Sequence, residues 1–161
     1  MEMRSNKQNE FMQEAIRLSI ENVASGKGGP FGAVIVKDGK IIARGANGVT
    51  STNDPTAHAE VVAIRNACAA LGTFQLDGCE IYTSCEPCPM CLGAIYWARP
   101  DKMYFANTKK DAADINFDDQ FIYEELELPY LNRKLQTEQI MRDEALEAFK
   151  LWSTSIAKIE Y

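Results

Sequence analysis

Two short stretches of the sequence contain the residue types of a catalytic metal site. His58, the only histidine among 161 residues, is followed two positions later by Glu60. Further along the chain, Cys88 and Cys91 form a Cys-x-x-Cys pair directly after Pro87. Zinc prefers four tetrahedral ligands such as imidazole nitrogen and thiolate sulfur, so one histidine and two cysteines leave a position for water. Because coordination lowers the pKa of water from about 16 towards 7, this set is typical of hydrolytic chemistry, with Glu60 as the proton carrier.

Both stretches are predicted to lie at the start of a helix. Asp54-Pro55-Thr56 offers turn and capping residues ahead of an apolar run over residues 61–71, and Pro89 suits a first helical turn. The N-terminus of a helix carries partial positive charge, which stabilises thiolates and an ionised Glu60. The same backbone geometry therefore favours metal binding and proton transfer.

Three other interpretations of these residues stay open at the level of sequence. Cys85 precedes Cys88 by three residues, so His58 with all three cysteines could form a closed structural zinc site. In that site Glu60 would have no catalytic role. Three cysteines so evenly spaced on one helical turn also fit tetrahedral coordination poorly. A buried histidine with ordinary reduced thiols is the second alternative. A redox pair of Cys85 and Cys88 is the third, and it lacks a thioredoxin-like context.

Composition and charge limit the class of protein and its partners. A chain of 161 residues predicts one domain that buries about two thirds of its unfolded surface. The formal charge of −6 is opposite to that expected of a nucleic-acid binder and favours a small uncharged substrate. An odd number of cysteines, with no secretory leader and no apolar run of membrane-spanning length, predicts a cytoplasmic location and no membrane partner.

The order of helix and strand patterns predicts an α/β fold. The expected elements are a helix over residues 9–25, strands over 33–37 and 41–45, a helix over 61–71, a strand over 80–83, a helix from Pro89 to Pro100, and a strand over 102–106. Asp38-Gly39 suits the tight turn of an antiparallel hairpin. The last strand-helix-strand unit implies a parallel crossover. We therefore predict a three-layer sandwich, with helices on both faces of a mixed sheet of about five strands.

The C-terminal part has weaker patterns. Residues 129–134 are interpreted as a linker and residues 135–141 as an edge strand. Residues 143–156 place apolar side chains on one stripe of a helix, which we expect to pack on the core. All of these segments are assigned to a single domain covering residues 1–161.

At the metal-site residues the sequence resembles the zinc-dependent cytidine deaminase superfamily, whose motif is His-x-Glu with Pro-Cys-x-x-Cys. Within it, the sequence is most similar to the guanine deaminase group of bacteria. The similarity runs from about Gly28 to Asp119, through residues 29–36, 53–60 and 82–99. It implies a cytidine deaminase-like fold and a hydrolase of purine catabolism. It further implies that Glu60 is catalytic, that His58, Cys88 and Cys91 hold one Zn²⁺ per subunit, and that the reaction converts guanine to xanthine and ammonia.

Several residues are candidates for binding the substrate. Asn47 carries a donor and an acceptor that suit the N7 and O6 edge of a purine, although alone it reads as a turn former. Asp118 and Asp119 lie in a predicted turn and could simply form a solvated acidic loop. The Phe-Asp-Asp run resembles the guanine deaminase group, and of the two we expect Asp119 to accept from the adjacent N1–H and amine of guanine, an edge at which a carboxylate would repel N1 of adenine. Phe31 and Trp97 could form opposite walls of a slot, or simply belong to the core. The resemblance adds Ala59 and Tyr161 to this set.

The resemblance also implies a homodimer, in which a C-terminal segment of about residues 130–161 crosses to the other subunit and closes its active site. Glu160-Tyr161 matches the Glu-Tyr ending of the group. The alternatives are deaminases of guanosine, cytosine or adenosine in transfer RNA. A zinc-stabilised interaction module without catalysis is the alternative from a different class.

Overall fold

The computed structural model describes residues 6–161, and these form two units. The first unit ends at Asp119 and contains the whole sheet. The second unit, Gln120–Tyr161, contains only helices and irregular segments. None of the helices in residues 6–161 is both long and apolar enough to cross a membrane.

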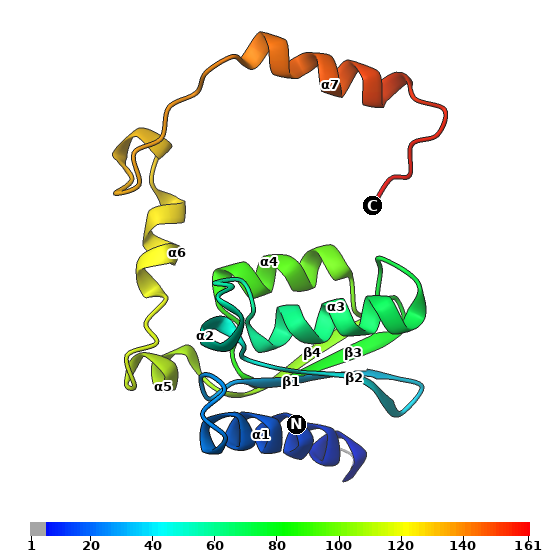
Figure 1. Cartoon of the computed structure of the whole chain (residues 1–161), viewed down its shortest axis with the longest axis vertical. Helices are drawn as coiled ribbons and strands as arrows, with labels where there is room; N and C mark the ends of the chain where they lie inside the picture. Colours follow the sequence, from blue (N-terminus) through cyan, green and yellow to red (C-terminus); the bar gives the residue numbers. More distant parts are fainter. Residues whose placement is uncertain (1–5) are drawn as a thin grey trace. The chain divides into compact units, whose positions relative to one another are not determined.

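The first unit is built on a mixed sheet, as predicted. Its elements are α1 (Asn6–Ala24), β1 (Gly32–Lys37), β2 (Lys40–Ala46), α2 (Val49–Thr52), α3 (Ala59–Leu71), β3 (Cys79–Cys85), α4 (Pro89–Ala98), β4 (Lys102–Asn107) and α5 (Lys109–Ala113). The strand order is β2-β1-β3-β4 (Figure 1). β1 pairs antiparallel with β2 and β3, while β3 pairs parallel with β4 across the predicted α4 crossover. The described residues form four strands, rather than about five.

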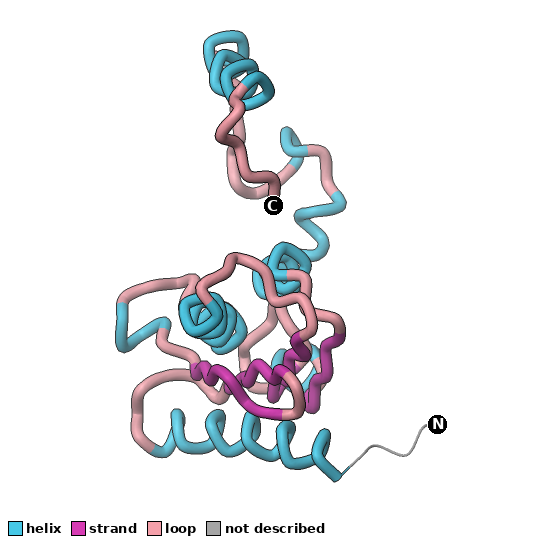
Figure 2. Tube along the Cα trace, turned by 90° about the vertical axis from the view of Figure 1, so that its right-hand side faces the viewer, coloured by secondary structure: helices cyan, strands magenta, loops and turns pink. Residues whose placement is uncertain are grey.

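The sheet is covered on both faces. Helix α1 lies on one face, and α3 and α4 lie on the other (Figures 1 and 2). Because both faces are covered, the first five residues of β1 are all buried. Ala33 and Ile35 belong to the core cluster under α3 and α4, whereas Val34 and Val36 pack with residues of α1. This alternation explains a strand that reads as one continuous apolar run.

The hairpin that joins β1 and β2 forms as the sequence predicts. Asp38 and Gly39 have φ angles of 51° and 70°, the left-handed values that a two-residue turn of this kind requires. The turn pairs Lys37 with Lys40, and a register shift between Ile35 and Val36 then aligns Gly32 with Ala46 at the other end of the hairpin. That end carries the loop before β1 and the start of the loop after β2.

A close backbone contact fixes α3 against β2, and it gives a stability prediction. A Cβ atom at Gly45 would lie 2.2 Å from the carbonyl oxygen of Ala59 and 2.5 Å from the amide nitrogen of Ala63. Gly45→Ala must therefore push away the start of α3, and we expect it to lower the free energy of unfolding by about 1–3 kcal/mol in urea titrations. The matched control is Gly93→Ala in the exposed face of α4, where nothing lies within 4 Å of the added atom. An equal loss in both variants would contradict this contact.

The second unit has no buried core of its own. It consists of α6 (Gln120–Glu127), a short 3₁₀ helix (Tyr130–Asn132) and α7 (Arg142–Thr154), and none of these contains a buried residue. The predicted strand over residues 135–141 is wrong, because this segment is irregular. The apolar stripe of α7, predicted to pack on the core, is instead exposed in the single chain: Phe149 is 73% exposed and Trp152 is 47% exposed.

Candidate active site

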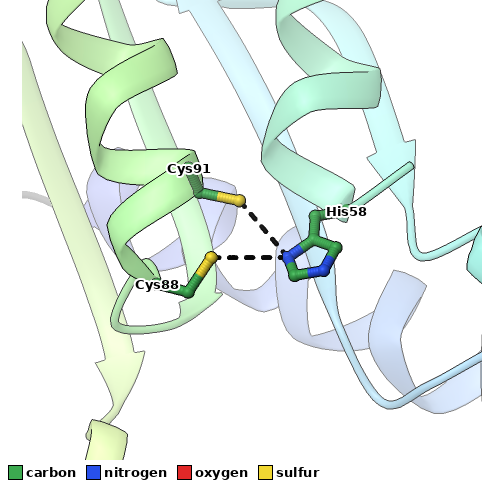
Figure 3. A group of neighbouring side chains, drawn as sticks. All are labelled: His58, Cys88 and Cys91. Atoms are coloured by element: carbon green, nitrogen blue, oxygen red, sulfur yellow. Dashed lines mark hydrogen bonds between the residues drawn. The ribbon is translucent and has the colours of Figure 1, made fainter. Parts of the chain in front are cut away.

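The only histidine and the Cys-x-x-Cys pair come together between the first turns of two helices. The Nδ1 atom of His58 lies 3.6 Å from the Cys88 sulfur and 3.5 Å from the Cys91 sulfur (Figure 3). Their potential ligand atoms all lie within 4.8 Å of one another. His58 is the N-cap of α3, and Cys88 is the N-cap of α4, with a proline in the first turn. Helix starts were predicted for both stretches, and the structure confirms them.

The electrostatics of this cluster favour a cation. The pKa of Cys88 is lowered to about 4, because its thiolate accepts a hydrogen bond from the Cys91 thiol and interacts with His58. The pKa of Cys91 is correspondingly raised by its bond to Cys88 and by burial. The Cys88 thiolate also raises the pKa of His58. A site that already stabilises one thiolate beside an imidazole has the donor set that zinc prefers.

Cys85 does not join the three potential ligands. Its thiol donates to the carbonyl oxygen of Thr108 at a distance of 3.6 Å, and burial raises its pKa to about 11. Within residues 6–161, the group that could hold a metal therefore comprises His58, Cys88 and Cys91. Three protein ligands leave the fourth position of a tetrahedron open, the arrangement of catalytic rather than structural zinc.

Glu60 lies beside the cluster in a buried position. The residue is 6% exposed, and its Oε2 atom lies 3.5 Å from the Cys91 sulfur. Its Oε1 atom lies 3.4 Å from the Thr83 hydroxyl, which makes a shorter hydrogen bond of 3.0 Å to the carbonyl oxygen of Cys85. Burial is the main cause that raises the pKa of Glu60, which brings it closer to the range needed for general acid-base chemistry. Sequence reasoning missed Thr83, because it lies 23 residues from Glu60 along the chain and no local pattern marks the contact.

Asn47 presents its amide in a defined orientation. Its Oδ1 atom accepts hydrogen bonds from the backbone N–H groups of Gly29 and Val49, each at 3.3 Å. Its Nδ2 atom makes no hydrogen bond within residues 6–161, and this atom is not fully buried. The acceptor half of the amide is therefore occupied by the protein, and the donor half remains for a ligand.

Phe31 and the turn that contains Asp119 are joined by an aromatic contact. The rings of Phe31 and Phe117 meet edge to face, with centroids 5.0 Å apart and an interplanar angle of 88°. Phe31 also packs against the core cluster under α3, so the substrate and core interpretations of this residue are compatible. Phe117 is a second contact that sequence reasoning missed.

Asp119 and Ala59 lie in the part of the first unit that carries the metal ligands. Asp119 is half-buried, and burial together with the Cys88 thiolate raises its pKa. Asp118, its neighbour, is exposed. Ala59 is fully buried as the first residue of α3, between His58 and Glu60.

The geometry of the metal-ligand cluster does not test two of the predicted substrate contacts. Trp97 is in the last turn of α4, at the opposite end from Cys88, and is 63% exposed. Tyr161 belongs to the second unit and is 68% exposed. Both therefore stay predictions.

The sequence matches one family and several characterised proteins. Residues 5–107 match the family described as the cytidine and deoxycytidylate deaminase zinc-binding region. The guanine deaminase of Bacillus subtilis (strain 168) is 56% identical over 151 residues, which cover 94% of this chain and 97% of that protein. The X-ray structure of guanine deaminase from Bacillus subtilis superposes with a TM-score of 0.93 at 56% identity, covering 95% of this chain and 98% of that one. A tRNA-specific adenosine deaminase of Aquifex aeolicus (strain VF5) is 41% identical over 119 residues, which cover 73% of this chain and 76% of that protein.

Proposed function

Because this chain belongs to the cytidine and deoxycytidylate deaminase zinc-binding family, we propose that it is a guanine deaminase, which hydrolyses guanine to xanthine and ammonia. The observation that carries the reaction type is the buried carboxylate of Glu60 beside three ligands that leave a metal position open. The similarity to guanine deaminase over nearly the whole chain supports the choice of substrate.

Glu60 moves the protons of this reaction. Zinc, held by His58, Cys88 and Cys91, would supply a water molecule acidified enough to attack at neutral pH. Glu60 accepts a proton from the attacking water and protonates N3 of the ring, which makes C2 more electrophilic. Once the C–O bond at C2 has formed, Glu60 takes the remaining proton of the added hydroxyl and delivers it to the amine, so that the C–N bond breaks, ammonia leaves and C2 becomes a carbonyl. One oxygen of the Glu60 carboxylate lies 3.4 Å from the Thr83 hydroxyl, and the other lies 3.5 Å from the Cys91 sulfur.

Asn47 and Asp119 form hydrogen bonds with two polar edges of guanine. The amide nitrogen of Asn47 donates to the O6 side of the purine, because its oxygen is already occupied by backbone N–H groups. Asp119 accepts from N1–H and from the amine. Phe31 offers its ring to the planar base, and Ala59 lines the site between His58 and Glu60. Adenine, with an acceptor at N1, would face the Asp119 carboxylate unfavourably.

The substrate edge assigned to Asp119 can be tested with its neighbour as the control. Asp119→Asn replaces an ionised carboxylate that accepts from both donors by an amide whose NH₂ group must face one of them, so kcat/KM for guanine should fall about 10- to 100-fold. Asp118→Asn, at an exposed position, should stay within about twofold of the wild type.

The pH dependence of KM gives a second check on Asp119. Burial raises its pKa above the ordinary 3.8, and only the ionised form accepts from both donors. KM for guanine should therefore rise as the pH falls through this raised pKa, and Asp119→Asn should remove that rise. Equal losses in Asp118→Asn and Asp119→Asn would contradict the assignment.

The second unit supports a homodimer that exchanges C-terminal segments. Gln120–Tyr161 exposes large apolar side chains and buries none in its helices, and so short a segment rarely folds without a partner surface. Its exposed apolar residues include Leu126, Leu131, Leu135, Ile140, Phe149, Trp152, Ile156 and Tyr161. In the proposed dimer, the segment from about residue 130 covers the active site of the other subunit and brings Tyr161 to it. Trp97 stays the proposed second wall of the substrate slot.

Subunit complementation tests this exchange. One variant carries Glu60→Gln with an intact C-terminus, and the other keeps Glu60 but lacks residues 156–161. If segments are exchanged, refolding equal amounts together restores about a quarter of the wild-type activity, because half of the dimers are mixed and each has one complete site. No recovery over the separate variants, in samples shown to contain mixed dimers, would contradict the exchange.

The remaining partners and the location follow from charge and thiol chemistry. The formal charge of −6 disfavours nucleic acid as a partner. The thiols proposed as ligands must stay reduced, which suits the cytoplasm. All five cysteines are free.

A further inference from the structure

Asn22 is a buried polar residue on α1 that the proposed reaction does not use. Its side chain belongs to a residue only 6% exposed. The Nδ2 atom donates two hydrogen bonds of 2.8 Å each, one to the carbonyl oxygen of Gly29 and one to the carbonyl oxygen of Asn47. Asn22 therefore ties the loop before β1 to the residue that follows β2.

The backbone segments joined by Asn22 are packed without room for a side chain. A Cβ atom at Gly28 would lie 2.1 Å from the carbonyl oxygen of Asn47 and 2.9 Å from Nδ2 of Asn22. From the same loop, the Gly29 N–H donates to Oδ1 of Asn47. Asn22 thus donates to the carbonyl oxygen of Gly29, and the N–H of Gly29 donates in turn to the side-chain amide of Asn47.

This arrangement decides which half of the Asn47 amide faces a ligand. Gly29 and Val49 both donate to Oδ1, so a flipped amide would place its NH₂ group against two N–H donors. The observed orientation leaves the NH₂ group for an acceptor. If Gly29 moves, one of the two donors that set this orientation is lost.

We propose that Asn22 is a positioning residue for substrate selection, which acts through Gly29 and the backbone of Asn47 to keep the Asn47 NH₂ group directed at a purine with an oxygen at position 6. A purine with an amine at that position would bring a donor against a donor. This inference rests on the proposed function and extends it to a residue on the opposite face of the sheet from α3.

The test combines Asn22 and Asn47 variants in a double-mutant cycle. Asn22→Ala should raise KM for guanine about tenfold with little change in kcat, because the recognition of O6 weakens while Glu60 is untouched. It should also weaken binding of hypoxanthine, which has O6 but no amine at position 2 and so reports on Asn47 without turnover. In the Asn47→Ala background, the same Asn22 change should have less than about a twofold effect.

The control and the second variant separate positioning from folding. Ser19→Ala lies on the same helix and removes a buried hydroxyl that donates only to Ile16 of its own helix, so KM should be unchanged. If Asn22→Ala does not fold, Asn22→Ser, which keeps a small polar side chain, replaces it in the double-mutant cycle with Asn47→Ala. Melting temperature and zinc content are measured for every variant.

The proposal is overturned if the Asn22 change weakens hypoxanthine binding by the same factor with and without Asn47, or if it leaves that binding unchanged. A wild-type protein that binds hypoxanthine through this pair yet does not deaminate guanine would retain the positioning role and remove the proposed function.

Discussion

Replacing Glu60 by glutamine is expected to abolish turnover while leaving the metal site intact. The amide is nearly isosteric with the carboxylate, but it cannot accept the proton of the attacking water or return one to the leaving amine. Loss of a general acid-base group costs about 10²- to 10⁴-fold in kcat, and a group that acts twice should lie at the upper end of that range. Ammonia release under saturating guanine measures kcat, and elemental analysis measures the bound zinc.

Glu86→Gln is the matched control for this prediction. Glu86 follows β3, close in sequence to the metal ligands, and its carboxylate accepts from the backbone N–H of Lys109. The control should keep kcat within a few-fold, since that carboxylate has no part in the proposed proton transfer. A near-normal kcat in Glu60→Gln would reduce Glu60 to a structural residue.

The second large effect is expected from a comparison of Cys88→Ser with Cys85→Ser, since Cys85 and Cys91 each lie three residues from Cys88 in the sequence. Cys88→Ser removes a proposed ligand, so the zinc affinity should fall by more than about 100-fold and the activity should be lost with it. Cys85→Ser should keep one zinc per subunit, because the Cys85 thiol donates to Thr108 and is not part of the three-residue cluster.

Zinc content of the two purified variants, measured after dialysis against a weak chelator, decides between an open and a closed site. Equal loss of zinc from both variants would mean that Cys85 is a fourth ligand, which leaves no position for water. Retention of zinc by both would remove Cys88 from the ligand set.

The chemistry of the site was predictable from sequence because it depends on few residue types at fixed spacings. His58 was the only imidazole available, and two thiolates three residues apart on a helix start could reach it. The hairpin at Asp38-Gly39 and the crossover between β3 and β4 were predictable for a similar reason, since each depends on local backbone preferences and on chain order. These features need no knowledge of distant contacts.

Features that depend on distant contacts were not predictable. Thr83 and Glu60 are 23 residues apart, and Asn22 and Asn47 are 25 residues apart. No local pattern marks such pairs. The stripe of α7 shows the same limit differently: periodicity indicates that Phe149 and Trp152 need a partner surface, but it does not say which chain provides it.

The most direct test is ammonia release by the zinc-loaded protein on guanine, guanosine, adenine, cytosine, cytidine and an adenosine-containing transfer RNA, assayed side by side. The proposed site predicts turnover of guanine alone, because the proposed contacts of Asp119 and Asn47 match its donors and its O6, and because a pocket closed by the exchanged segment of the proposed dimer would exclude ribose. Turnover of guanosine would keep the chemistry and contradict the closed pocket. No turnover of guanine by protein with one bound zinc per subunit would contradict the proposed function.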